Sequence, residues 1–448
     1  MKVAGIILAA GNGARMRTKK PKPLHTVAGL SLLAHTVRIM RAGGIGAIQV
    51  VVSRALAGHP ALKDILGDDI EISVQTEPRG TADALKAARS VFAAADTLVV
   101  APVDMILVTG EFVRRMITLH RESNALSTIL ASEVDDASGL GRVKLDDLGQ
   151  PVSVLEETET DESSLHSNLV NTAWYCFDNN WIWDVLNLVE PARNGEIYLP
   201  RVIENASELG RAMMLVSDPD AGRGINDLKQ LAVVEKIMRR RANELHMQSG
   251  VTIQDPDSTY IDLDVEIGCD TYIGAGSHIG AGSKIGRNVI IGSNTKITRS
   301  LILDDATVDG ARVVDSTIGD KCFVGSNSLV RGGSELKMEV KIGNLVEIKH
   351  SVIGSNSRIS HFSYMGDATV GENVNIGAGT VTCNFDGIEK HRTLIGDGAF
   401  IGSNTMFIAP VKIGNFARTG AGAVVRSEVY EGETVVGVPA KSITSTSK

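Results

Sequence analysis

The sequence predicts an α/β domain with a mostly parallel sheet, followed by a connecting helix and a parallel β-helix. Apolar runs alternate with helical patterns through the first half of the chain, and a six-residue repeat runs from about Asp257 to about Val438. The chain has 448 residues, and a single hydrophobic core stops growing at roughly 250–300 residues. We therefore expect a first domain at 1–225, a connecting helix at 226–248 and a second domain at 249–448.

The first domain shows a strand–helix rhythm. Apolar runs of strand length are separated by stretches with helical periodicity, which favours a mostly parallel sheet covered by helices. The expected strands are Val3–Ala9, Ala47–Val52, Ile70–Gln75, Thr97–Val103 and Ser127–Ala131.

One long helix is expected between the two domains, from Asn226 to Met247. Its apolar residues recur three, four or seven positions apart. An Arg-Arg-Arg run at 239–241 falls inside it, and we interpret this run as a solvated helix face rather than a docking patch. The apolar residues are Leu228, Leu231, Val234, Met238 and Leu245.

The repeat in the second half places an apolar residue at every sixth position. Isoleucines from Ile267 to Ile297 keep this spacing, which continues to Leu303, and most are followed by glycine. Each unit supplies one short strand with an inward apolar residue and then a small residue at a corner, so that coils stack about 4.8 Å apart. A second register appears at Ile395, Ile401, Phe407 and Ile413, with Val370 and Ile376 between the two registers.

Composition narrows the possible functions. The net charge is −8 with both signs interspersed, which argues against a nucleic-acid partner. No apolar run approaches the roughly 20 residues of a membrane span. The four cysteines stand far apart without a Cys-x-x-Cys pair, so we expect reduced core thiols in a cytoplasmic protein.

A glycine-rich segment with basic residues follows the first strand. It reads Leu-Ala-Ala-Gly-Asn-Gly-Ala-Arg-Met from Leu8 to Met16, and Lys22 comes shortly after. Glycines let backbone N–H groups approach phosphate oxygens, while Arg15 and Lys22 can balance the charge of a triphosphate. The segment is neither a dinucleotide fingerprint nor a P-loop, because Met16 replaces the third glycine and no Gly-Lys-Ser/Thr is present.

The segment and later motifs together resemble the signature of the sugar nucleotidyltransferases, which have a Rossmann-like domain. The resemblance implies that a nucleoside triphosphate and a sugar phosphate bind at the residues that match the signature. These are Leu8, Ala9, Ala10, Gly11, Gly13, Arg15, Lys22, Gln75, Gly80, Thr81, Gly141, Glu156, Asn171 and Asn226.

Asp104 is the candidate metal ligand. It follows an expected strand at the carboxyl edge of the sheet, where ligands of such folds bind. A carboxylate there can hold Mg²⁺ against phosphates, and the resemblance pairs it with Asn226. Nucleotidyl transfer then needs little more than positioning and charge neutralisation. Pro102 and Val103 depart from the family's pattern beside this carboxylate.

Polar stretches interrupt the six-residue repeat where a plain solenoid would not need them. The most specific are 361–367, with His-x-x-Tyr-x-Gly-Asp, and 375–384, with Asn-x-Gly-Ala-Gly-Thr-x-Thr-Cys-Asn. They resemble hexapeptide-repeat acyltransferases, and in particular the bifunctional bacterial enzymes that acetylate glucosamine 1-phosphate and uridylylate the product. The resemblance covers essentially the whole chain. It implies a left-handed β-helix, acetyl-CoA as donor and a homotrimer with acyl sites between subunits.

His361 is the candidate catalytic base. Acyl transfer to an amine benefits from a base near neutral pH, and histidine has the right intrinsic pKa. The resemblance implies that Asn384 helps to place the acetyl group and that the segment from Phe385 to Arg392 forms a loop over the site. It further implies sugar-phosphate contacts from Arg331, Lys349, Tyr364 and Asn375, and coenzyme A contacts from Ala378, Asn384, Phe385, Ser403 and Ala421.

The resemblance implies two reactions. Acetyl-CoA and glucosamine 1-phosphate give N-acetylglucosamine 1-phosphate, which reacts with UTP to give UDP-N-acetylglucosamine and pyrophosphate. One alternative keeps the architecture but uses glucose 1-phosphate with dTTP or UTP and acetylates a wider range of amino sugars, which Pro102 and Val103 favour. Another is a scaffold with a decayed nucleotide domain, against which Lys22 and Asp104 argue.

Overall fold

The computed structural model describes residues 2–11, 13–88, 95–156, 167–192 and 195–444, so that Asn12 of the glycine-rich segment lies outside it. The chain divides into two compact units, residues 1–238 and 239–448. Helix α8 (Leu228–Gln248) contains the division point. Within the described ranges, no helix combines the length and the apolarity that a membrane crossing needs.

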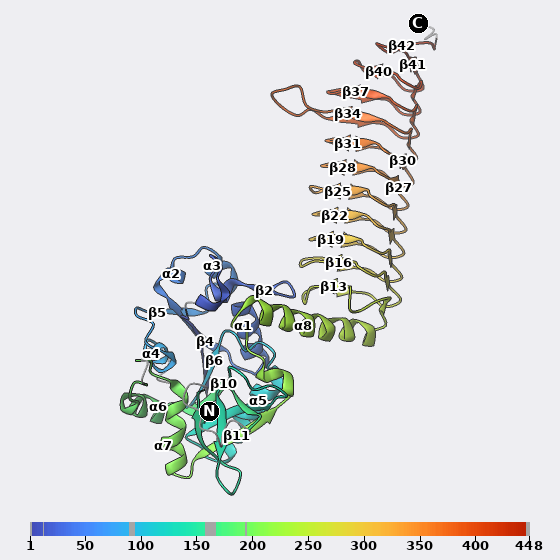
Figure 1. Cartoon of the computed structure of the whole chain (residues 1–448). Helices are drawn as coiled ribbons and strands as arrows, with labels where there is room; N and C mark the ends of the chain where they lie inside the picture. Colours follow the sequence, from blue (N-terminus) through green and yellow to red (C-terminus); the bar gives the residue numbers. More distant parts are fainter. Residues whose placement is uncertain (1, 12, 89–94, 157–166, 193–194, 445–448) are drawn as a thin grey trace. The chain divides into compact units, whose positions relative to one another are not determined.

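The first unit is built around a nine-stranded sheet with the order β11-β7-β10-β6-β1-β4-β5, and β8 and β9 extend from β10 (Figure 1). Strands β6, β1, β4 and β5 are parallel to one another, whereas β10 is antiparallel to β6 and β7. The predicted α/β class is therefore confirmed. The strands are β1 (Val3–Ala9), β4 (Ala47–Ser53), β5 (Glu71–Gln75), β6 (Thr97–Pro102), β7 (Ser127–Glu133), β8 (Arg142–Leu145), β9 (Pro151–Leu155), β10 (Leu169–Asp178) and β11 (Ala212–Ser217).

Helices pack on this sheet, and short polar side chains cap the first turn of two of them, α1 and α5. Ser31 Oγ accepts from the backbone N–H of Ala34 at 3.1 Å, and Thr109 Oγ1 accepts from Phe112 at 3.4 Å. A β2–β3 hairpin (Thr26–Val27, Leu30–Ser31) precedes the first helix. The helices are α1 (Leu32–Ala42), α2 (Arg54–Ala57), α3 (Ala61–Leu66), α4 (Thr81–Lys86), α5 (Gly110–Glu122), α6 (Trp181–Val185) and α7 (Val202–Glu208).

The apolar stripe predicted for the long helix is only partly buried. The predicted helix is present as α8, in which Val234 is buried, whereas Leu228 and Leu245 are 46% and 63% exposed. The buried positions near the end of α8 are instead Ala242 and Asn243. Asn243 Nδ2 donates to the backbone oxygens of Pro256 and Thr259, at 2.9 and 3.1 Å, so a polar cap replaces apolar packing beneath the first coil of the β-helix.

The basic run in α8 is not uniformly solvated. The Arg239 guanidinium stacks 3.7 Å from the ring centroid of Tyr260, a cation–π contact. Arg240 pairs with Glu244 one turn later at 3.1 Å. The predicted solvated face is therefore correct for Arg240 and wrong for Arg239.

The second unit is a β-helix of three parallel sheets, seen as stacked coils in Figure 1. After the first coil and up to β40, each strand pairs with the strand three positions earlier, so one coil gives one strand to each sheet. At the end of the chain β39 pairs with β41, which pairs antiparallel with β42. The sheets begin at β12 (Thr252–Ile253), β13 (Tyr260–Ile261) and β14 (Glu266–Ile267), and the chain ends on β41 (Thr434–Val436) and β42 (Lys441–Ser442). Inward isoleucine and valine side chains form one continuous core along the coils.

The six-residue spacing breaks after Ile297. The next inward residue is Ile302, whereas Leu303 is half-buried, which corrects the expected continuation to Leu303. The corner closes one residue early because Arg299 adopts a left-handed backbone conformation, with φ 46°. Three later corners have the same form, with Asp315, His350 and Asp367 at φ 49°, 48° and 50°. The second register is confirmed, since Ile395, Ile401, Phe407 and Ile413 are buried, as are Val370 and Ile376 between the two registers.

The four cysteines are free. Cys176 and Cys322 are buried and Cys383 is half-buried, whereas Cys269 is exposed and is therefore not a core thiol. Burial raises the pKa of the Cys322 thiol to about 11.

Candidate active sites

A cleft of about 570 Å³ opens at the carboxyl ends of β1, β5 and β6. Its walls include most of the glycine-rich segment and the candidate metal ligand, together with Pro102 and Val103. Parallel α/β sheets bind ligands at this edge. The residues predicted from the signature that line the cleft are Leu8, Ala10, Gly11, Gly13, Lys22, Gln75, Gly80, Thr81 and Asp104.

Lys22 links the two candidate metal ligands. Its ammonium forms an ion pair with the Asp104 carboxylate and donates to Asn226 Oδ1 at 3.3 Å. Arg15 Nη2 donates to the same Asn226 oxygen at 2.9 Å. The Lys22 ammonium thus lies between the Asp104 carboxylate and the Asn226 amide oxygen. Carboxylate and amide oxygens are the ligand types that Mg²⁺ prefers.

Buried contacts hold Asp104 and Asn226 at this point. The indole Nε1 of Trp174, in β10, donates to Met105 O at 3.1 Å. The backbone N–H of Ile225 donates to Asp104 O at 3.1 Å, which ties the turn after β6 to the residue before Asn226. Segments far apart in the sequence therefore meet through backbone hydrogen bonds and place both side chains.

Position 80 in the wall of the cleft requires glycine. Its φ is 114°, and a Cβ there would lie 2.5 Å from Ile197 O. Gln75 Nε2 donates to Gly80 O at 3.2 Å, and Thr81 Oγ1 accepts from the N–H of Leu199 at 2.9 Å. The wall of the cleft is therefore held by backbone contacts that exclude larger residues.

A second group of predicted residues lies together beside the main sheet, outside the residues that line the cleft. The N–H of Asn171 donates to Gly141 O at 2.9 Å, and a Cβ on Gly141 would lie 3.7 Å from Glu156 Oε1. Asn171 Nδ2 donates to the hydroxyl of Tyr175 at 2.6 Å. Burial raises the pKa of Tyr175, so its hydroxyl stays protonated. Ala9 is buried in β1.

Sequence reasoning missed four residues that line the cleft: Pro78, Ala84, Glu196 and Tyr198. Glu196 and Tyr198 stand in an irregular segment before a short 3₁₀ turn at Leu199–Arg201. No periodic pattern marks such a segment, so spacing alone gave no signal. Hydrogen bonds bring it to the cleft: the Ala82 N–H donates to Ile197 O at 3.0 Å, and the Ile197 N–H donates to Arg79 O at 2.8 Å.

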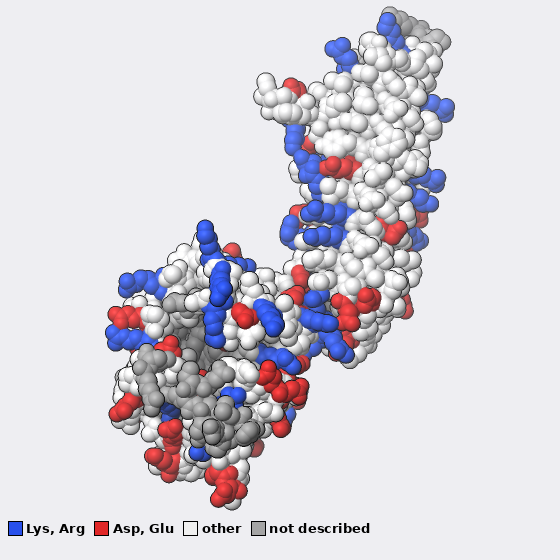
Figure 2. Space-filling view, in the orientation of Figure 1, with Lys and Arg blue, Asp and Glu red and all other residues white. Residues whose placement is uncertain are grey.

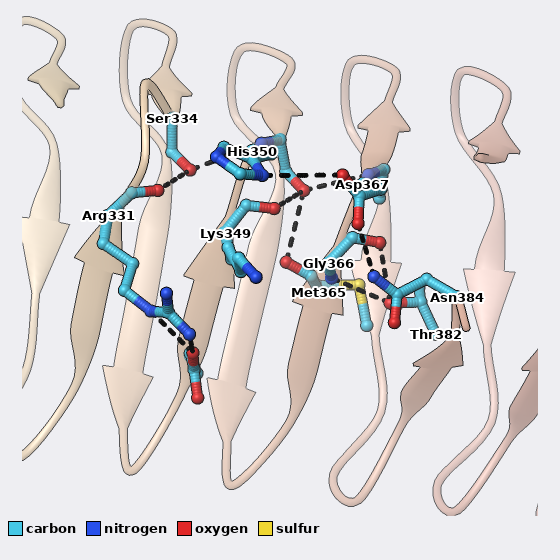
Figure 3. A network of polar contacts seen from close by, with 12 residues as sticks. Arg331, Ser334, Lys349, His350, Met365, Gly366, Asp367, Thr382 and Asn384 are labelled. Atoms are coloured by element: carbon cyan, nitrogen blue, oxygen red, sulfur yellow. Dashed lines mark hydrogen bonds and ion pairs between the residues drawn. The ribbon is translucent and has the colours of Figure 1, made fainter. Parts of the chain in front are cut away.

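Cationic side chains gather on one face of the β-helix. Arg331 ends β25 (Leu329–Arg331) and Lys349 ends β28 (Glu347–Lys349), and the two residues are direct neighbours in the sheet. Glu347 Oε1 accepts from Arg331 Nε and Nη2, at 2.9 and 2.6 Å. Figure 3 shows both basic side chains on the same side of the strands.

Lys390 adds a third positive charge to this face. Its ammonium lies beside Lys349 and, with Arg331 nearby, lowers the pKa of Lys349. Figure 2 shows Lys and Arg side chains gathered along this edge of the β-helix, below the protruding loop. Three converging cations form a site suited to a phosphate group.

Tyr364 lies next to the cationic face. It begins β31 (Tyr364–Gly366), and its ring crosses the backbone of Gly366, which is the direct neighbour of Lys349 in the sheet. The phenol is therefore aimed along the face that carries Lys349.

The other predicted residues lie on a different strip of the β-helix. His361 ends β30 (Arg358–His361) and is exposed. Ala378 and Ser403 occupy the same corner on successive coils, because Asn404 N–H donates to Ala378 O at 2.7 Å, and Gly422 N–H likewise donates to Ser403 O at 2.8 Å. Ala421 follows on the next coil. Asn375 begins β33 (Asn375–Ile376), beside Arg358 of β30.

Asn384 lies between the cationic face and a loop. It follows β34 (Val381–Cys383), is largely buried, and donates from Nδ2 to the carboxylate of Asp367. The predicted loop, Phe385 to Arg392, leaves the coil here. Asp386 closes it by accepting from His391 Nε2 at 2.7 Å, a contact that raises the pKa of His391 and lowers that of Asp386.

The two units, with one candidate site each, define the class of the protein as a transferase. One is a cleft of the kind that holds nucleotides, and the other lies on a β-helix. Residues 5–160 match the family model of the MobA-like NTP transferase domain. Residues 264–299 and 392–427 match the bacterial transferase hexapeptide model, and residues 316–344 match the hexapeptide repeat of succinyl-transferase. The β-helix is therefore of the left-handed hexapeptide type.

Relatives resemble the chain over nearly its full length. "Bifunctional protein GlmU" of Syntrophomonas wolfei is 37% identical over 434 residues, which cover 96% of both chains. The protein of the same name from Heliobacterium modesticaldum is 38% identical and covers 97% of this chain and 95% of its own. That of Pelotomaculum thermopropionicum is 41% identical, over 92% and 90%. The chain belongs to the GlmU family of bifunctional proteins, and the predicted enzyme class is confirmed.

Proposed function

We propose that this chain makes UDP-N-acetylglucosamine by acetylating glucosamine 1-phosphate in the β-helix and then transferring a uridylyl group in the first unit. The observation that supports it most directly is the presence of two built sites in a chain of this family. Lys22, Asp104 and Asn226 converge in the cleft, and Arg331 and Lys349 converge on the β-helix. Free cysteines suit the reducing cytoplasm, where we place the protein.

In acetyl transfer, the cationic face binds the phosphate of glucosamine 1-phosphate. Arg331 and Lys349 neutralise its charge, and Tyr364 and Asn375 contact the sugar. His361 takes a proton from the attacking amine as nitrogen bonds to the thioester carbonyl carbon, and the carbon–sulfur bond breaks to release coenzyme A. Asn384 and Phe385 contact the acetyl end of the donor, while the small side chains of Ala378, Ser403 and Ala421 leave room for the rest of it.

In uridylyl transfer, a phosphate oxygen of N-acetylglucosamine 1-phosphate attacks the α-phosphorus of UTP, and pyrophosphate leaves. The glycine-rich segment lets backbone N–H groups reach the triphosphate, and Arg15 and Lys22 neutralise its charge. The other residues of the signature hold the base and the sugars. When bound, Mg²⁺ would neutralise developing charge on the phosphates, and Asp104 and Asn226 would hold it.

The acetyl site needs more than one copy of the chain. The strip with His361 and the face with Arg331 and Lys349 lie on different sides of a corner of one coil, so neighbouring copies would complete each other's site. Large apolar side chains near these strips are exposed, which supports burial against another copy. They are Phe362, Phe385, Phe400 and Phe416, at 57%, 59%, 52% and 62% exposure. We propose a homotrimer.

Subunit complementation tests this arrangement. Inactive Arg331→Ala chains and inactive His361→Ala chains are co-expressed with different tags, and mixed assemblies are purified. We expect mixed trimers to recover part of the acetyl transfer, because some sites receive both intact residues. Mixed assemblies with no acetyl transfer, or a monomer in analytical ultracentrifugation, would contradict the shared site.

A second candidate keeps the architecture but changes the nucleotide. Pro102 and Val103 line the cleft beside Asp104, and both depart from the family's pattern. A glucose-1-phosphate nucleotidyltransferase with broad amino-sugar acetylation would show a preference for dTTP. Nucleotide profiling with both sugar phosphates decides between them, and we expect the highest kcat/KM with UTP and N-acetylglucosamine 1-phosphate.

A further inference from the structure

Asp367 lies at the centre of a polar network on the β-helix (Figure 3). Its N–H donates to Lys349 O at 3.0 Å, and its carbonyl accepts from Thr393 at 3.2 Å. Carboxylate Oδ2 accepts from Asn384 Nδ2, and Oδ1 lies 3.6 Å from His350 Nδ1. The side chain is only 17% exposed. Asp367 thus touches the backbone of one proposed substrate ligand and the side chain of another.

A carboxylate at this position fixes how the amide of Asn384 is turned. An ionised carboxylate only accepts hydrogen bonds, so the amide NH₂ group, not its oxygen, must face Asp367. The backbone of Asn384 is fixed as well, since its N–H donates to Thr382 O at 2.9 Å and its carbonyl accepts from His391 at 2.8 Å. Asn384 Oδ1 therefore points away from Asp367, and it stays available for a bound substrate.

Comparison with Asp315 shows that this use of the corner is particular to Asp367. Both aspartates occupy shortened corners with left-handed backbone, at φ 49° and 50°. The Asp315 carboxylate accepts hydrogen bonds from Arg299 at 2.6 and 2.9 Å, and both side chains are exposed. One carboxylate oxygen of Asp367 instead accepts a hydrogen bond from Asn384. The corner itself therefore does not require the contact to Asn384.

We propose that Asp367 is a positioning residue for acetyl transfer, which orients the Asn384 amide and so sets where the acetyl group lies. The inference rests on the proposed acetyltransferase function of the β-helix. His350 supports Asp367 from the side opposite Asn384, and its ring packs where a Cβ on Gly332 would come within 2.7 Å. Asp367 does not touch the reacting atoms, and its effect passes through Asn384.

The test compares Asp367→Asn with Asp315→Asn in the full-length chain. An amide at 367 can donate as well as accept, so it no longer dictates how Asn384 is turned. We expect kcat for acetyl transfer to fall about 10- to 100-fold, as misplacement by an ångström does, with KM for glucosamine 1-phosphate changed less than about threefold. Asp315→Asn should leave both constants unchanged, and uridylyl transfer should be unchanged in both variants.

Two further variants separate orientation from structural support. Asp367→Gly keeps the left-handed corner, which glycine favours, and should lose kcat to the same extent as Asp367→Asn. The double variant Asp367→Asn/Asn384→Asp restores a hydrogen bond with donor and acceptor exchanged. If Asp367 acts by orienting the Asn384 amide, kcat should not recover in the double variant, because residue 384 is then no longer an amide.

Three outcomes would overturn the inference: kcat within about threefold of the parent for Asp367→Asn or Asp367→Gly, a rise in KM alone, or recovery in the double variant. A parent chain without acetyl transfer would instead overturn the proposed function, so the two failures are distinguishable.

Discussion

The ring of Tyr364 lies directly over the backbone of Gly366. A Cβ on Gly366 would come within 2.3 Å of the Tyr364 hydroxyl oxygen, which no side chain allows without movement. Glycine at 366 therefore lets the phenol lie flat on the sheet beside the neighbour of Lys349.

Replacing Gly366 with alanine should push the Tyr364 ring off the sheet. We expect KM for glucosamine 1-phosphate to rise about tenfold, the worth of one hydrogen bond, with uridylyl transfer unchanged. Steady-state kinetics of Gly366→Ala, Tyr364→Ala and the double variant check this. If the alanine acts through the phenol, the double variant is no worse than Tyr364→Ala, whereas additive losses would contradict the mechanism.

The loop after Asn384 should loosen as pH rises. Asp386 raises the pKa of His391 above its ordinary value, and Glu389 is the other charged group that faces it. Because the pKa of His391 is higher in the closed loop than in the open loop, the protonated ring stabilises the closed loop fully when the pH lies below the open-loop pKa. This stabilisation is lost as the pH rises through the closed-loop pKa. The pKa of Asp386 is lowered, so this carboxylate stays ionised and stabilises the closed loop until the pH becomes strongly acidic.

Hydrogen exchange of residues 385–392 between about pH 6 and pH 9, corrected for intrinsic rates, measures this opening. We expect protection to fall toward the alkaline end in the parent and to be low throughout in His391→Gln. Equal protection across the range in the parent would show that the ion pair does not close the loop.

The sequence predicts the inward residues of the β-helix only where the six-residue repeat is regular. Ile267 to Ile297 obey a strict spacing, so their burial follows from the pattern. Ile302 could not be predicted, because the left-handed conformation of Arg299 shortens the corner and moves the inward position by one residue. Left-handed backbone at a non-glycine residue leaves little trace in the sequence.

The same limit applies to the candidate sites. Motifs identified Ala378 and Ser403, but the inserted loop between them hides the coil length, so their common corner is seen only in the structure. Glu196 and Tyr198 reach the cleft through the backbone of an irregular segment, and no spacing rule covers that contact. Asp367 belonged to a recognised motif, yet its contact with Asn384 required the stacking of coils.

The first coil of the β-helix should depend on Asn243. Asn243→Ala leaves two backbone oxygens at Pro256 and Thr259 without their donor, at a cost of about 1–3 kcal/mol for unpaired buried groups. We expect a lower thermal transition by circular dichroism than for Gln248→Ala, an exposed control on the same helix. Equal transitions in the two variants would mean that the cap contributes nothing.

Removal of divalent cations should separate the two reactions. Chelation with EDTA is expected to abolish uridylyl transfer, since Asp104 and Asn226 would lose their ion, and to spare acetyl transfer, which uses neither residue. Added Mg²⁺ should restore the lost reaction. Uridylyl transfer that persists after chelation and dialysis, or acetyl transfer that disappears with it, would contradict the assigned metal site.

The central claim is that one chain carries two independent active sites, and paired substitutions assayed for both reactions test it most directly. His361→Ala should lower acetyl transfer at least about 100-fold, as loss of a general base does, and leave uridylyl transfer at the parent rate. Asp104→Ala should do the reverse. If either variant keeps its own reaction near the parent rate, or if both reactions fall together in a folded variant, the account is wrong.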